Sequence, residues 1–416
     1  FPQKGEAIKL ALLLTRIMFP AVLFMALAGL AMGILNSYEH FTAPAIAPVL
    51  WNLVIILMVV FASSRWGVVS LALGITLGSL VQFLFQLPFI RKREARYSLI
   101  LNWRHPGVKE VGALIIPVVL SLASTEINVV VDTRFASTLV TGSIASLGYA
   151  VRLWTLPISL FAIAAATVLF PSFSRLAAKG DIKGLRQTFS QGIRMVFSIL
   201  IPASVGLMVL CIPIVRLIFE RGEFTKTSTL FTAGALFYYS IGIFAAGGLH
   251  LVNRTFYSIK DTRTPMIVTS IAIIINYFGD WFLMKFLPAT VQRFNVPLNL
   301  QWLGYAHGGI ALSTSLVCFF NFFILVEILR RRLGGIEGKK IFLNFVKVSL
   351  ASVALGFFAY YSWKVTALKF GISTSGQLIS VGSGIFAGIL AYLICAYHLR
   401  IEEVSQMKKL ILERFK

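Results

Sequence analysis

Eleven apolar stretches, each long enough to cross about 30 Å of hydrocarbon as a helix, constrain the fold of this chain more than any other feature. Of its 416 residues, 57% are hydrophobic and only 13% are charged. A soluble domain of this size needs more polar surface than that, so the sequence predicts an all-α polytopic membrane protein. The expected spans lie near residues 8–33, 41–62, 67–90, 109–137, 143–172, 192–219, 229–252, 264–287, 308–329, 341–363 and 376–398.

The basic residues are divided unequally between the two sets of loops that connect these spans. The net charge of +22 would suggest a nucleic-acid partner for a soluble protein, but here the charges cluster in short loops. One face carries 25 of the 38 lysines and arginines, and the other carries 10. Because cytoplasmic loops are enriched in Lys and Arg, the richer face, which includes the C-terminus, is predicted to be cytoplasmic. No nucleic-acid partner is expected.

The start of the chain fits this orientation poorly. Eleven crossings place the two ends on opposite sides of the membrane, so Phe1 would lie outside without a signal peptide. We therefore expect an odd number of further spans before Phe1 in the natural protein.

Two segments indicate an internal repeat. Asn36–Pro44 (NSYEHFTAP) is similar to Tyr257–Pro265 (YSIKDTRTP), and each lies between a Gly/Ala-rich span and a second apolar span. Spans one to three therefore resemble spans seven to nine. Duplicated halves with a site between them are typical of transporters. If each half has six spans, three spans precede Phe1.

A few polar side chains lie inside the apolar spans, where each charge opposes insertion by roughly 2.5–3.5 kcal/mol. Asp132 and Asp280 are five to seven residues from the outer ends of their spans, and Asn276 is one turn deeper than Asp280. Thr314 lies at a similar depth in a third span, with Ile310 one turn above it. Helix rise places all of them about 8–10 Å below the outer surface.

This set of ligand atoms suits a small hard cation such as Na⁺. It comprises two carboxylates, an amide, a hydroxyl and a backbone carbonyl, whereas His and Cys, the usual ligands of transition metals, are not involved. No transition metal is expected. The alternative is that Asp132 and Asp280 face a water-filled cavity without a bound ion.

Arg152 lies about ten residues from the outer end of its span, roughly 15 Å deep, which is too far to reach the headgroups comfortably. A planar guanidinium with five donors suits a diphosphate ligand. The alternative is an internal ion pair with Glu126 or Asp132.

The chain resembles the MurJ (MviN) family of the multidrug/oligosaccharidyl-lipid/polysaccharide exporter superfamily over essentially its whole length. The resemblance is strongest at these segments: Gly33–Asn36, Pro44–Pro48 with Asn52, Arg152 with Pro157, Thr167–Pro171, Glu223–Thr225, Phe256–Tyr257 and Asp261–Pro265. It implies a fourteen-helix protein of the bacterial inner membrane, with two six-helix lobes and two further C-terminal helices. Residues 1–106 would be the remnant of the first lobe, 107–333 the second lobe, and 334–416 the final two helices with an amphipathic tail.

The resemblance also implies a function and a site. The family moves lipid II, an undecaprenyl-diphosphate-linked disaccharide-pentapeptide, from the inner to the outer leaflet by alternating access driven by Na⁺ or the membrane potential. Such a protein is a monomeric carrier in contact with membrane lipids, not an enzyme, and it needs no cofactor apart from Na⁺. The family's essential arginine falls on Arg152, and its sodium site falls on Asp132, Asn276, Asp280, Ile310 and Thr314. This chain has Thr155 three positions after that arginine, where some members of the family carry an acidic residue. The last two spans would form the groove for the lipid tail.

Three other functions remain open from the sequence. A multidrug exporter, or an exporter of another lipid-linked oligosaccharide, would share the architecture, although Arg152 argues against an acidic drug cavity. A membrane enzyme of polyprenyl-phosphate metabolism would need a D-D-x-x-D run to hold Mg²⁺, which the loops lack. A scaffold for cell-wall synthesis would leave the intramembrane charges unexplained.

Overall fold

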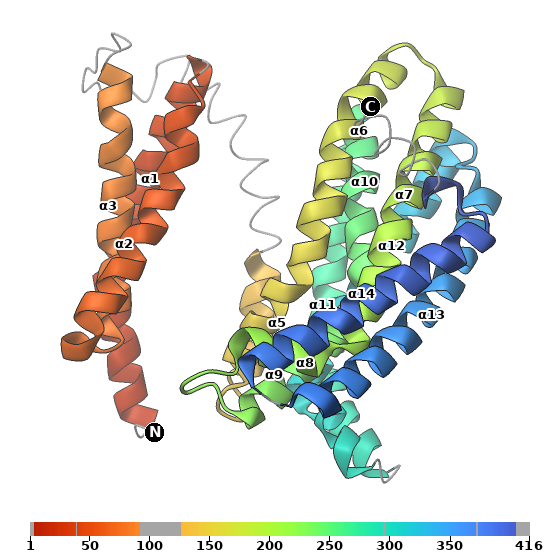
Figure 1. Cartoon of the computed structure of the whole chain (residues 1–416). Helices are drawn as coiled ribbons and strands as arrows, with labels where there is room; N and C mark the ends of the chain where they lie inside the picture. Colours follow the sequence, from red (N-terminus) through yellow and green to blue (C-terminus); the bar gives the residue numbers. More distant parts are fainter. Residues whose placement is uncertain (1–3, 39, 92–125, 294–296, 372, 405–416) are drawn as a thin grey trace. The chain divides into compact units, whose positions relative to one another are not determined.

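The computed structural model describes residues 4–38, 40–91, 126–293, 297–371 and 373–404, and the chain divides into two compact units, residues 1–109 and 110–416. The described residues form helices and no strands, as the sequence predicts. The first unit consists of α1 (Lys4–Ser37), α2 (Thr42–Trp66) and α3 (Val69–Arg91), drawn in red to orange in Figure 1.

Close helix packing holds the first unit together. α3 packs against both α1 and α2. A Cβ atom at Gly78 would lie 2.9 Å from the carbonyl oxygen of Trp51, so a glycine is required where α3 meets α2. Between α3 and α1, the hydroxyl of Thr76 donates to the carbonyl of Ile17 at 2.7 Å. Small residues and side-chain hydrogen bonds of this kind stabilise helix pairs in lipid, where water cannot satisfy polar groups.

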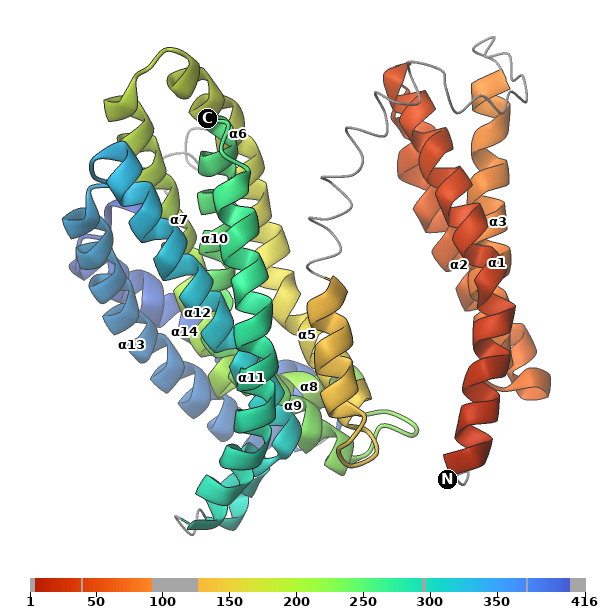
Figure 2. The same cartoon turned by 180° about the vertical axis from the view of Figure 1, so that it is seen from behind.

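The second unit contains all the other described helices (Figures 1 and 2). Residues 126–136 form its first described helix. The elements that follow are α5 (Ser143–Pro157), the π-helix η1 (Ile158–Ile163), α6 (Ala164–Ala178), α7 (Ile182–Val209), α8 (Cys211–Phe219), α9 (Lys226–Ile241), α10 (Ile243–Ser258), α11 (Arg263–Arg293), the 3₁₀ helix η2 (Leu298–Gly304), α12 (Ala306–Leu333), α13 (Gly338–Phe370) and α14 (Thr374–His398).

Most of the described helices are candidate membrane spans by length and composition, with α5, η1 and α6 counted as one. Nine of them are long and apolar enough to cross a bilayer, or up to ten if the pair α9 and α10, bent by 47° at its break, is one span. Large apolar side chains remain exposed on the helices, with Leu368 81% and Phe386 72% accessible, as expected of surfaces that face lipid. The structure confirms an all-α polytopic membrane protein. The predicted span 109–137 lies largely outside the described residues.

Two segments differ from the sequence prediction. The predicted span 192–219 is two helices, because α7 begins at Ile182 and ends at Val209, before the short helix α8. Pro213 cannot donate to the carbonyl of Val209, which favours a break at this point. The sequence also predicts a surface segment on the outside at 289–305, but α11 continues to Arg293 and Trp302 of η2 is only 8% exposed. Its ring packs against Phe237 of α9.

The pair α13 and α14 runs side by side along α7 (Figure 1). The hydroxyl of Tyr392 on α14 donates to the carbonyl of Ser198 on α7 at 2.6 Å. Just beyond α14, Ile401 and Glu403 are 3% and 6% exposed. The first residues of the predicted amphipathic tail therefore pack against the protein instead of lying on the leaflet. Met407, Ile411 and Phe415 lie outside the described residues.

An ion pair joins the loop between α10 and α11 to the end of α12. The carboxylate of Asp261 pairs with the guanidinium of Arg332, and its Oδ1 accepts from the backbone amide of Thr264 at 3.0 Å. Burial opposes ionisation of this carboxyl, but the hydrogen bonds from Thr264 and the nearby Arg332 hold its pKa below the ordinary value. This pair fixes the predicted cytoplasmic end of α12 to the neighbouring loop.

Candidate functional site

Side chains from helix 126–136 and from α11 meet in a buried polar cluster. The Nδ2 atom of Asn276 donates to Oδ1 of Asp132 at 2.7 Å and to Oδ2 of Asp280 at 3.2 Å. Asn276 and Asp280 are one helical turn apart on α11, and both are fully buried. The structure thus brings together three residues that are up to 148 positions apart in sequence.

The third helix of the cluster is α12. The Thr314 side chain faces the carboxylate of Asp132, and its hydroxyl donates to the carbonyl of Ile310 at 3.2 Å. Asp132 also faces Asp280 directly. Asp132, Asn276, Asp280, Ile310 and Thr314 therefore lie around one location, and we call them the polar cluster.

Two members of the surrounding shell were not predicted. The Ser313 hydroxyl donates to both the backbone oxygen and Oδ1 of Asn276, each at 3.3 Å. Tyr239 of α9 is 3% exposed, and its hydroxyl faces Thr314 and the carboxylates of Asp132 and Asp280. A serine or a tyrosine is inexpensive in an apolar span, so neither residue stands out in the sequence as a charged residue does.

Close approach of α11 and α12 positions the cluster. A Cβ atom at Gly309 would lie 2.5 Å from the carbonyl carbon and oxygen of Leu283, which are backbone atoms that cannot move aside. Gly279 likewise has no room for a side chain, because the Ser313 hydroxyl occupies that space. The two helices therefore approach closely at both glycines, through the backbone of Leu283 at Gly309 and through the Ser313 side chain at Gly279.

The charges in the polar cluster require a positive partner. The carboxylate of the fully buried Asp280 faces that of the partly buried Asp132, and Oδ1 of Asp280 has no hydrogen-bond partner among the described residues. Repulsion between buried like charges is relieved by a cation or a bound proton. The oxygen donors present fit a small hard cation. Among the described residues, no group of three or more His, Cys, Asp or Glu side chains is arranged to hold a metal.

Arg152 lies on α5 with its side chain exposed. Its guanidinium carbon is 5.7 Å from the centroid of the Tyr149 ring, and that ring packs against Phe219 and Phe224. Among the described side chains, no carboxylate is within ion-pair distance of Arg152, so the alternative pairing with Glu126 or Asp132 is not formed. The cation is available to a ligand.

The helix that carries Arg152 changes geometry just after it. α5 ends at Pro157, and the π-helix η1 follows before α6 resumes α-helical winding. Proline removes one backbone donor, and π-helical turns inside α-helices are frequent at functional sites. The hydroxyl of Thr155, at the position where the sequence departs from some family members, donates to the carbonyl of Val151 at 2.7 Å. It therefore supplies no charge to Arg152.

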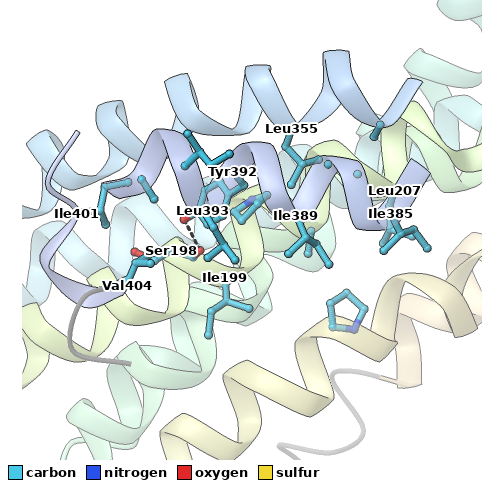
Figure 3. Close-up of a pocket in the computed structure, with 18 of the residues that line it drawn as sticks. Ser198, Ile199, Leu207, Leu355, Ile385, Ile389, Tyr392, Leu393, Ile401 and Val404 are labelled. Carbon is cyan, nitrogen blue, oxygen red and sulfur yellow. Dashed lines mark hydrogen bonds between the residues drawn. The ribbon is translucent and has the colours of Figure 1, made fainter. Parts of the chain in front are cut away.

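An apolar groove of about 1670 Å³ lies between α5, α7, α8, α13 and α14 (Figure 3). Its lining includes Leu355 of α13, Ile385, Ile389 and Leu393 of α14, and Ile199 and Leu207 of α7. Its polar boundary lies near Arg400 and Glu402, at the end where the chain leaves α14. The groove suits a long apolar chain with a polar end.

Together these features define a class: an all-helical polytopic membrane protein with a buried polar cluster in one helix bundle and an unpaired arginine on a neighbouring helix. The profile of the family described as "Lipid II flippase MurJ" matches residues 2–378. The chain therefore belongs to the MurJ family.

Individual relatives agree with this assignment. The "Probable lipid II flippase MurJ" of Vibrio cholerae serotype O1 is 35% identical over 330 residues, which cover 78% of this chain and 58% of the relative. The "Lipid II flippase MurJ" of Burkholderia cenocepacia is 30% identical over 334 residues, which cover 79% of this chain and 61% of the relative. The chain thus spans about 60% of the length of these relatives.

A solved structure supports the fold. The structure titled "Lipid II flippase MurJ, inward closed conformation" superposes with a TM-score of 0.73 and 28% sequence identity. The superposition covers 93% of this chain and 74% of that one. The helix arrangement of this chain is therefore that of a membrane protein of this family.

Proposed function

We propose that this protein moves lipid II from the inner to the outer leaflet of the bacterial cytoplasmic membrane by alternating access. Family membership supports lipid II as the substrate, because the curated relatives are named lipid II flippases. The observation that carries the proposal within this chain is Arg152, a permanent cation inside a membrane span with no carboxylate partner among the described side chains. An anionic diphosphate supplies the missing charge.

The apolar groove can accommodate the polyprenyl chain of the substrate. Lipid II combines a charged diphosphate with a long polyprenyl chain, and the groove between α7, α13 and α14 opens beside α5, the helix of Arg152. Leu153, Leu156 and Pro157 of α5 line the groove. A single ligand can therefore contact the groove with its apolar tail while its charged group approaches the exposed side of α5.

We propose that Na⁺ occupies the polar cluster and contributes to the driving force. The fit of the donors and the unmatched charge of two facing carboxylates support this. The membrane potential is a second source of energy, worth about 2.3 kcal/mol for each elementary charge moved through 100 mV. A multidrug exporter is less well supported, because an unpaired arginine favours an anionic ligand over a cationic drug.

Arg152→Ala, introduced into the full natural gene product, is expected to abolish growth of a strain depleted of its own flippase. Arg152→Lys should restore growth only partly, because lysine keeps the charge but not the bidentate geometry. Arg134→Ala is the matched control, since Arg134 is also exposed but lies at the end of its helix. Normal growth of the Arg152→Ala strain, with the protein present in the membrane, contradicts the proposed role.

Asp280→Ala is expected to remove the stabilisation of the protein by sodium. For the wild type in detergent, the unfolding temperature should rise in NaCl relative to choline chloride, because a ligand that binds the folded state stabilises it. Asp181→Ala is the control. Asp181 caps the first turn of α7 by accepting from the amide of Gly184 at 2.8 Å, so its loss lowers stability without affecting the sodium response. An unchanged sodium response in Asp280→Ala would exclude the polar cluster as the binding site.

A further inference from the structure

The polar cluster and Arg152 are on different helices, and a continuous set of contacts joins them. The hydroxyl of Tyr239 lies beside Thr314, and the carboxylates of Asp132 and Asp280 are near enough to act on it electrostatically. On its other side, the Tyr239 ring packs against the indole of Trp154 on α5, with ring centroids 5.6 Å apart and planes inclined by 36°. Tyr239 is therefore the residue that touches both the cluster and the helix of Arg152.

Tyr239 is attached firmly to the cluster side. The hydroxyl of Ser315, next to Thr314 on α12, donates to the carbonyl of Tyr238 at 2.7 Å and to that of Tyr239 at 3.2 Å. Just after Tyr239, a Cβ atom at Gly242 would lie 2.8 Å from the backbone of Ser315, so α9 ends in direct contact with α12. A displacement of α12 at the cluster is therefore carried directly to Tyr239.

Trp154 is placed to pass such a displacement to Arg152. They are two positions apart on α5, which puts their side chains roughly 200° apart around the helix at 3.6 residues per turn. Trp154 faces inward against α9, and Arg152 faces outward with its side chain exposed. A rotation of α5 driven at Trp154 thus moves Arg152 through a similar angle on the opposite side.

The backbone directly after α5 offers a place where a rotation of α5 can be absorbed. Pro157 and the π-helix η1 interrupt the regular hydrogen-bond pattern directly after α5. The indole N–H of Trp154 is buried and has no hydrogen-bond acceptor among the described residues. A buried donor without a partner is disfavoured, so this arrangement of Trp154 is not held in place by a polar contact.

We propose that the Tyr239–Trp154 contact couples occupancy of the polar cluster to the position of Arg152, so that cation binding regulates capture of the diphosphate. This inference rests on the proposed function and adds the route of coupling. Two ligands that bias the same two-state element change each other's affinity by the same factor. Sodium and lipid II are therefore coupled through α5, and loss of the contact abolishes the coupling while both sites still bind.

The test measures the affinity of the purified full natural protein for lipid II in sodium chloride and in choline chloride. For the wild type, we expect the two affinities to differ by about tenfold, within the usual range of allosteric coupling. Tyr239→Phe removes the hydroxyl that faces the cluster, and Trp154→Leu removes the ring contact. In both variants the ratio of affinities should fall to about one, while sodium still raises the unfolding temperature.

Two control variants isolate the contact from general effects of substitution. Tyr238→Phe loses a neighbouring hydroxyl, which donates to the carbonyl of Leu303 at 2.9 Å, and should keep the wild-type ratio. Trp154→Phe keeps an aromatic ring against Tyr239 and should keep most of the wild-type difference between the two affinities. If Tyr239→Phe and Trp154→Leu keep the wild-type ratio of affinities, the contact does not carry the coupling. That result overturns this inference and leaves the proposed function intact. A wild type that binds lipid II equally in both salts overturns the coupling itself, and one that does not bind lipid II overturns the proposed function.

Discussion

Asn276 is the residue that holds the polar cluster together. Its amide nitrogen has two hydrogens, and the structure directs them to Asp132 and Asp280, at 2.7 and 3.2 Å. Its Oδ1 accepts from the hydroxyl of Ser313 at 3.3 Å. An asparagine is suited to this position because its amide bridges the two carboxylates without adding charge. The negative charge of the carboxylates is then still available to a cation.

Asn276→Leu is expected to destabilise the protein by about 2–4 kcal/mol, because two buried carboxylates lose their shared donor. The measurement is thermal unfolding in detergent without sodium. Asn321→Leu on α12 is the matched control: this asparagine is also buried, but its Oδ1 has no hydrogen-bond partner, so we expect a loss below about 1 kcal/mol. Equal losses in the two variants would show that Asn276 does not bridge the carboxylates.

At the scale of helices, hydropathy and helix rise predicted which polar residues could meet, but not which helices are neighbours. Asp132, Asp280 and Thr314 were assigned to one level because each could be counted from the end of its span, and they do lie together. Which helices are neighbours depends on packing, which no single sequence shows. Tyr239 was missed for that reason, since its role depends on its position between α12 and α5.

Helix ends inside apolar sequence were also difficult to predict. Val209 and Pro213 lie in one continuous apolar run, so hydropathy gave a single span where the structure has α7 and α8. Trp302 belongs to the stretch predicted to lie on the surface, but it is buried and its ring packs against Phe237 of α9. In both cases tertiary contacts, not local composition, decide the outcome.

Gly309→Ala tests whether the contact between α11 and α12 positions the cluster. The added methyl group meets the backbone of Leu283 at 2.5 Å, so the helices must separate. We expect a loss of stability of about 1–3 kcal/mol and a smaller effect of sodium on the unfolding temperature. Gly382→Ala on α14, where a Cβ atom meets nothing within 4 Å, should be neutral or slightly stabilising. A full sodium response in Gly309→Ala would argue against this role of the helix contact.

At the scale of the whole molecule, each unit has a contact between a loop and the end of a helix, at positions that the predicted internal repeat makes equivalent. In the second unit, Asp261 pairs with Arg332 near the end of α12. In the first unit, His40 occupies the position of Asp261 and stacks on Phe89 near the end of α3, with centroids 5.3 Å apart. The contact at these two positions therefore differs in chemistry, an ion pair in the second unit and a ring stack in the first.

The pair α13 and α14, which lies outside the predicted repeat, is joined to α7 within the second unit by an ion pair. Glu403 contacts the Arg194 guanidinium of α7 at 2.5 Å and accepts from the Asn344 amide of α13 at 2.6 Å. Glu402 also reaches Arg194, at 3.3 Å, but its side chain is 73% exposed. The two adjacent glutamates therefore differ mainly in burial, which makes them a matched pair for an experiment.

Glu403→Ala is expected to destabilise the second unit by about 3–5 kcal/mol, because Arg194, whose side chain is 11% exposed, keeps its charge without a buried partner. Glu402→Ala should change stability by no more than about 1 kcal/mol, since solvent screens an exposed pair. Thermal unfolding measures both losses, and hydrogen exchange should locate the effect of Glu403→Ala in α13 and α14. Replacing Arg194 and Glu403 together by leucine should recover much of the loss, because no unpaired charge then remains. If the double variant is as unstable as Glu403→Ala, the loss comes from the packing of this end of α14 and not from the uncompensated arginine.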